Sequence, residues 1–131
     1  MDKTSMFMIF ESTEQTGNQQ RLINPLPLIQ LESIPGNYSF VLVFCVSGLE
    51  PLPEHVVSLS FISPSGGKTD LISNQVMSSP PPSDQTNSLG ATLKVDIRNM
   101  VFREEGVHTV SLTVDSDNFT GYLPVRKRNE A

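Results

Sequence analysis

Residues 101–126 read VFREEGVHTVSLTVDSDNFTGYLPVR, and this stretch decides the fold. Apolar and hydroxyl side chains alternate strictly from Thr109 to Val114. A period of two is typical of a β-strand with one buried face. The polar residues 115–118 then interrupt the run with side chains that tolerate tight turns, and a second alternating run follows from Phe119 to Val125. The stretch therefore predicts a β-hairpin close to the end of the sequence.

The composition is that of an ordinary globular domain. The chain has 131 residues, of which 37% are hydrophobic and 18% charged. This length supports one domain with a substantial core and is short for two. We therefore expect residues 1–131 to form a single domain that ends in a polar tail at 127–131. The net charge of −5 would repel a phosphate backbone, so we expect no nucleic-acid partner.

Cysteine use and apolar run lengths predict a cytoplasmic protein without a membrane partner. Cys45 is the one cysteine, which excludes an internal disulfide, whereas small secreted domains are usually held by disulfides. Because Cys45 lies within an apolar run, we expect it to be buried and inert. The first residues contain no apolar segment long enough for a signal peptide. The longest apolar run, Phe40–Val46, is far shorter than the roughly 20 residues of a membrane helix.

Further alternating or apolar runs predict the remaining strands. These runs are 6–11, 38–46, 55–63, 68–72 and 91–97, together with 21–31, where two prolines indicate an edge segment. Run 38–46 is apolar on both faces, which is typical of a central strand covered on both sides or of a strand that packs in an oligomer. Residues 12–20 are polar and contain a glycine, so we expect a turn or loop there. The pattern predicts an all-β, antiparallel sandwich of seven to eight strands.

Two sets of motifs carry a resemblance to known proteins. Residues 104–110, EEGVHTV, resemble the acidic-x-Gly-x-Tyr segment of the penultimate strand in immunoglobulin-like domains, with His108 in place of the tyrosine. The proline-interrupted segment 22–31, the S-P-S-G-G-K run 63–68 and the G-x-H-x-x-x-L-x-V strand 106–114 occur in the order seen in short bacterial and phage sandwich proteins of unknown function. The resemblance implies an immunoglobulin-like β-sandwich and no particular activity.

The two histidines do not predict a catalytic site. On the strand register, His108 shares a face with Val110, so we expect it at the edge of the core with a hydrogen bond to a backbone carbonyl. His55 follows a proline-containing loop at the start of a strand, and we expect it to be exposed. The sequence contains no G-x-S-x-G motif around a nucleophile. We therefore expect that the protein is not an enzyme and has no cofactor.

Neither a metal site nor a phosphate-binding loop is predicted. Asp115, Asp117 and Asn118 could hold calcium only weakly, since the other ligands of an EF-hand loop are missing, and turn chemistry explains them. Residues 65–69, SGGKT, lack the spacing of a P-loop and link two strands, so no helix N-terminus follows to bind phosphate.

The most distinctive remaining segment is 74–90, NQVMSSPPPSDQTNSLG. We expect it to be a long, exposed loop, either a recognition surface or a flexible linker. The candidate partner-binding residues are Pro80, Pro81 and Pro82, with Leu49 and Pro51 of a second loop. The sandwich fold, the acidic charge and the absence of a catalytic set of residues predict a non-enzymatic protein-binding module, such as a phage or prophage accessory protein or an inhibitor of a host system. The alternatives are a structural subunit that self-associates as a homo-oligomer and an uncharacterised enzyme.

Overall fold

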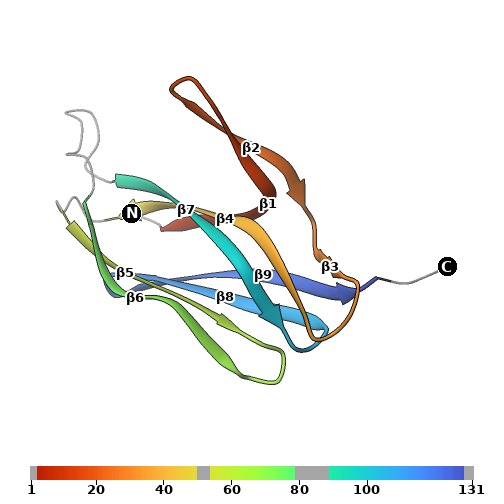
Figure 1. Ribbon diagram of the computed structural model, residues 1–131. Coiled ribbons are helices and arrows are strands. Elements are labelled where there is room, and N and C mark those ends of the chain that lie inside the picture. The colour runs from red at the N-terminus through yellow and green to blue at the C-terminus, as the bar shows by residue number, and fades with distance from the viewer. Residues whose placement is uncertain (1–2, 50–53, 79–88, 129–131) are drawn as a thin grey trace.

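In the computed structural model, every regular element among the described residues is a β-strand (Figure 1). The structure describes residues 3–49, 54–78 and 89–128. The strands in these residues are β1 (Thr4–Thr16), β2 (Gln19–Leu26), β3 (Ile29–Leu31), β4 (Gly36–Leu49), β5 (Glu54–Ile62), β6 (Lys68–Ser78), β7 (Leu89–Phe102), β8 (Gly106–Val114) and β9 (Asp117–Lys127). None of the described residues forms a helix that is long and apolar enough to cross a membrane.

The strands form two sheets that face each other, which confirms the all-β, two-layer prediction (Figure 1). One sheet has the order β2-β1-β4-β7 and the other the order β3-β9-β8-β5-β6. Neighbours pair antiparallel, except that β3 runs parallel to β9. The described residues hold nine strands where seven to eight were predicted. The additional strand arises because the predicted edge segment 21–31 divides into β2 and β3. Residues 12–20, predicted to be a turn or loop, instead continue β1 and β2 with a turn at Gly17 and Asn18.

The predicted hairpin is confirmed as β8 and β9, which pair antiparallel from Gly106–Val125 to Val114–Asp117. Every second side chain of β8, from His108 to Val114, is buried, and the residues between them are half-buried. The alternation in the sequence therefore marks the face that packs into the core between the sheets. The two predicted strands that residues 65–69 link also pair with each other, as β5 and β6, and the amide of Ser63 donates to the carbonyl of Gly67 at 2.8 Å.

The second apolar face of β4 is covered within the chain. Val41 and Val43 point away from the core, yet they are only 4% and 6% exposed. Flanking side chains of β1 and β7 lie beside them, and Lys94 of β7 reaches Gln20 of β2, with 3.3 Å between Nζ and Oε1. This confirms the prediction of a strand covered on both sides, and an oligomer is not needed to cover it.

Cys45 lies on the same outer face as Val43 but is only half-buried. Its neighbours across the strands are Met6, which is 61% exposed, and Thr92, whose Oγ1 lies 3.8 Å from Sγ. The prediction that Cys45 is buried was therefore wrong. Apolar neighbours along its own strand say nothing about the neighbours across the sheet, and those decide its exposure.

The described strands at the sheet edges are interrupted or short. Each of β2, β6 and β7 contains one asparagine with positive φ, at 54° for Asn24, 47° for Asn74 and 53° for Asn99. Asn74 lies where the pairing register of β6 with β5 shifts, and Asn99 lies where that of β7 with β4 shifts. All three bond to that inner strand, Asn24 to Glu11, Asn74 to Ser58 and Asn99 to Ser39. The fourth edge, β3, has three residues. Such edges are poor templates for an added strand.

The two sheets approach closely where Phe7 of β1 lies over Gly121 of β9. A Cβ atom at position 121 would overlap the Phe7 ring, with only 2.7 Å to Cδ1. We therefore expect Gly121→Ala to lower the free energy of unfolding by about 1–3 kcal/mol, because the ring must leave its position. Urea unfolding followed by fluorescence or circular dichroism measures the change.

The double variant Phe7→Leu/Gly121→Ala provides the control. Because the smaller side chain makes room for the new methyl group, the two substitutions should cost less together than the sum of their separate costs. An unfolding midpoint of Gly121→Ala equal to that of the wild type would contradict the close contact.

Candidate functional site

The predicted partner-binding residues fall mostly outside the described residues. Pro51, Pro80, Pro81 and Pro82 lie outside them, and so does the tail from residue 129. Leu49 is described and is 3% exposed, so its side chain packs in the core and does not offer a surface. Strands β6 and β7 include both ends of segment 74–90, and β9 includes Lys127. Recognition by the proline segment therefore stays a prediction.

His108 packs in the core as expected. Its side chain is 4% exposed, and its Nδ1 donates to the carbonyl oxygen of Gly106 at 3.3 Å. The ring meets Phe102 of the opposite sheet edge-on, with 5.3 Å between the ring centroids. The prediction of a core-edge histidine that bonds a backbone carbonyl is confirmed.

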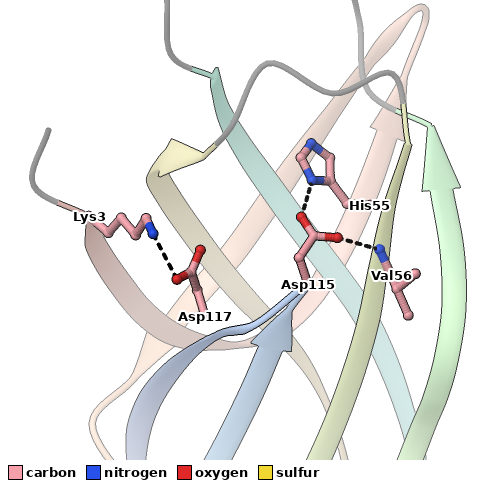
Figure 2. Close-up of polar contacts among 5 residues, drawn as sticks. All are labelled: Lys3, His55, Val56, Asp115 and Asp117. Carbon is pink, nitrogen blue, oxygen red and sulfur yellow. Dashed lines mark hydrogen bonds and ion pairs between the residues drawn. The ribbon is translucent and has the colours of Figure 1, made fainter.

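His55 forms a polar clamp with the turn between β8 and β9 (Figure 2). Its Nδ1 lies 2.7 Å from Oδ2 of Asp115, while Oδ1 of Asp115 accepts from the amide of Val56 at 3.0 Å. The amide of Asp115 in turn donates to the carbonyl of Val56 at 2.8 Å. Asp115 has a φ of 57°, which aspartate tolerates better than most residues. The start of β5 is thereby fastened to this turn.

The prediction that His55 is exposed was wrong, since it is only 4% exposed. The signal that could have placed it is the alternation of His55, Val57, Leu59 and Phe61, all of which face the core. Asp115 could not have been found in this way, because it lies 60 positions away and was explained by turn chemistry alone.

The clamp is poorly arranged for catalysis. Nε2 of His55 is buried and has no hydrogen-bond partner among the residues that the structure describes. A general base must reach the proton that it removes, and this nitrogen is closed off from solvent. Within residues 3–49, 54–78 and 89–128, no three histidine, cysteine or carboxylate groups gather to hold a metal. Asp117, the other carboxylate of the turn, instead pairs with Lys3 at 2.8 Å (Figure 2).

The Asp115 carboxyl is tuned by two opposing effects. Burial by itself would raise its pKa, but the hydrogen bonds from His55 and the Val56 amide outweigh burial and hold the pKa below its ordinary value. The ionised carboxylate is therefore the form that stabilises the fold.

A groove on the open side of the sandwich is the best candidate for a functional site. The edge strands β6 and β7 belong to different sheets and lie on the same side of the molecule (Figure 1). Between them is a hollow of about 420 Å³, lined by Thr69 and Leu71 of β6, by residues 95–98, 100 and 101 of β7, and by Arg103 just beyond β7. Side chains at the margin of the core are therefore accessible between these two edge strands.

The groove combines an apolar floor with a charged rim. Leu71, Val95 and Met100 are half-buried beside the core, and Val101 is 49% exposed. On the rim, Arg98 pairs with Asp96 at 2.8 Å. Arg103 has no ion pair with any described residue. Exposed apolar groups with a polar rim are a feature of surfaces that bind other proteins.

Comparisons with other proteins found nothing similar. No protein-family model matches the chain, and no curated protein or solved structure matches it. The resemblance to immunoglobulin-like bacterial and phage proteins therefore stays a prediction.

The clamp predicts how stability depends on pH. Asp115→Asn should lower the free energy of unfolding by roughly 1–2 kcal/mol at pH 7, because a charge-assisted hydrogen bond is lost. Since the folded state lowers the pKa of Asp115, its contribution is complete above the unfolded pKa and disappears as pH falls through the folded value. Urea titrations from pH 7 down to about pH 3 should show the two proteins converging.

Asp117→Asn is the matched control in the same turn. Its ion pair with Lys3 is partly exposed, with side chains 24% and 37% accessible, so the substitution should cost less than about 1 kcal/mol. Equal effects of the two substitutions at pH 7 would mean that the clamp does not fasten β5.

Proposed function

We propose that this chain is a non-enzymatic protein-binding module built on an immunoglobulin-like β-sandwich. The observation that carries the proposal is the groove between β6 and β7, where half-buried core side chains meet an arginine without an ion pair among the described residues. A partner that covers this groove would remove apolar surface from water and supply the missing negative charge.

The strand order supports an immunoglobulin-like arrangement. In that architecture one sheet carries strands G, F and C, to which variable-type domains add C′, and the other places B beside E. The order β9-β8-β5-β6 fits the first sheet, and the pairing of β4 with β7 fits the second. The parallel contact of β3 with β9 adds a short strand at the outer edge of the first sheet.

The use of the two histidines supports binding over catalysis. The rings of His55 and His108 are each 4% exposed, and both serve contacts inside the fold. The interrupted edges of β2, β6 and β7 favour recognition through side chains over self-association by strand pairing. A binding module that works as a single copy accounts for both features.

Capture from cells of the native host tests the proposal when it is made dependent on the groove. Val101→Glu/Arg103→Glu reverses the groove's chemistry at two accessible positions. It should reduce recovery of any captured partner at least about tenfold, as expected for residues near the centre of an interface. Quantitative mass spectrometry of the bound fraction is the measurement.

The matched control is Val107→Glu/Arg126→Glu, which makes the same two changes on another surface. Val107 is 53% exposed and Arg126 is exposed, so the fold should tolerate both substitutions, and the control should recover the partner as the wild type does. Recovery that is the same for both double variants, or the lack of any reproducible partner, would contradict the proposal.

A further inference from the structure

We propose that the groove between β6 and β7 takes an extended, acidic segment of the partner protein, with one apolar side chain seated between the sheets. This inference rests on the protein-binding function proposed above and adds the chemistry of the partner. Its support comes from the floor of the groove, from the charge on its rim and from the course of β7.

The floor is an apolar seat at the margin of the core. Ile97 is 6% exposed at its base, and Leu71, Val95 and Met100 surround it with half-buried side chains. The hollow has a volume of about 420 Å³ and is open to solvent. An inserted apolar side chain would cover surface that the two sheets leave open, because β6 and β7 do not pair with each other.

The rim is positive, although the chain carries a net charge of −5. Of the charged residues that line the groove, Asp96 is paired with Arg98, and this leaves Arg103 to face the partner. The Arg98–Asp96 pair is itself exposed, with side chains 74% and 57% accessible, so solvent screens it and Arg98 can also reach an incoming carboxylate.

The two glutamates that follow Arg103 in the sequence, Glu104 and Glu105, accept hydrogen bonds from residues outside the groove. Oε1 of Glu104 accepts from both the amide and the hydroxyl of Ser65 at 2.8 Å. Glu105 accepts from the amide of Lys127 in β9. Neither glutamate lines the groove, so neither neutralises Arg103 there. Acidic side chains on the partner would therefore complement the rim.

The course of β7 favours an extended occupant. Val95 and Ile97 lie two residues apart on one face of the strand, and an extended peptide presents its own side chains with the same period. The register shift at Asn99 interrupts the edge of β7 beside the groove, so the peptide would bind through side chains and not as a regular added strand.

Fluorescence anisotropy with a labelled peptide that alternates Asp and Leu tests the inference. The matched probe alternates Lys and Leu. The wild type should bind the acidic peptide about tenfold more tightly than the basic one, and added salt should weaken the binding, because exposed charges are screened within about 10 Å at 0.1 M. Arg103→Glu should weaken acidic-peptide binding about fivefold or more, whereas Arg103→Lys should keep most of it.

Arg126→Glu makes the same charge change away from the groove and should bind the acidic peptide as the wild type does. Equal binding of the acidic and basic peptides would overturn the inference, and so would equal losses for Arg103→Glu and Arg126→Glu. Thermal unfolding of each variant shows that it is folded when it is tested.

The outcomes separate this inference from the proposed function. If capture from cells depends on the groove but the acidic peptide does not bind, the partner's chemistry is overturned and the protein-binding function stands. If the acidic peptide binds in an Arg103-dependent way but capture is independent of the groove, the preference of the groove for acidic segments stands and the proposed function is contradicted.

Discussion

Phenylalanine packing between the two sheets is the interaction on which the rest of the structure depends. Phe40 of β4 lies 6.3 Å from Phe61 of the opposite sheet and 6.3 Å from Phe102 of its own sheet, measured between ring centroids. All three side chains are at most 2% exposed. Phe102 then meets His108 of the facing sheet, so these rings join four strands across the core. The burial of such large apolar groups is the main source of stability in a domain without a disulfide.

Packing between the sheets does not cover the edge strands, whose backbone groups could pair with a strand of another chain. Three of the described edge strands carry a left-handed asparagine that is tied to the inner strand, and the fourth has three residues. Asparagine suits these positions because its polar side chain tolerates the left-handed region. The result discourages strand addition at the edges, while the side of the molecule between β6 and β7 keeps an accessible apolar groove.

Local alternation was enough to predict the two-layer β-fold. The runs that became β5, β8 and β9 have one buried face in sequence and in structure, and Pro25 correctly indicated that β2 lies at an edge. What the sequence could not show depends on neighbours across the sheets. Cys45 is half-buried because Met6 and Thr92 flank it, and no pattern along its own strand contains that information.

The candidate sites were harder to predict for the same reason. The clamp joins His55 to Asp115 across 60 positions, and the groove joins Leu71 to residues 95–103 of another sheet. Only the inward register of His55 was available from the sequence. Pro80, Pro81 and Pro82, which stand out in the sequence, lie outside the described residues, whereas the groove is a surface that only the folded chain assembles.

The central claim is that the interrupted edge strands do not pair with other chains and that binding takes place through side chains in the groove between β6 and β7. Sedimentation equilibrium over a wide range of protein concentrations tests it most directly. The account predicts a single species with the monomer mass of 14.4 kDa up to the highest soluble concentration. A reversible dimer, with edge-strand amides of β2 or β7 that become protected from hydrogen exchange as it forms, would contradict it.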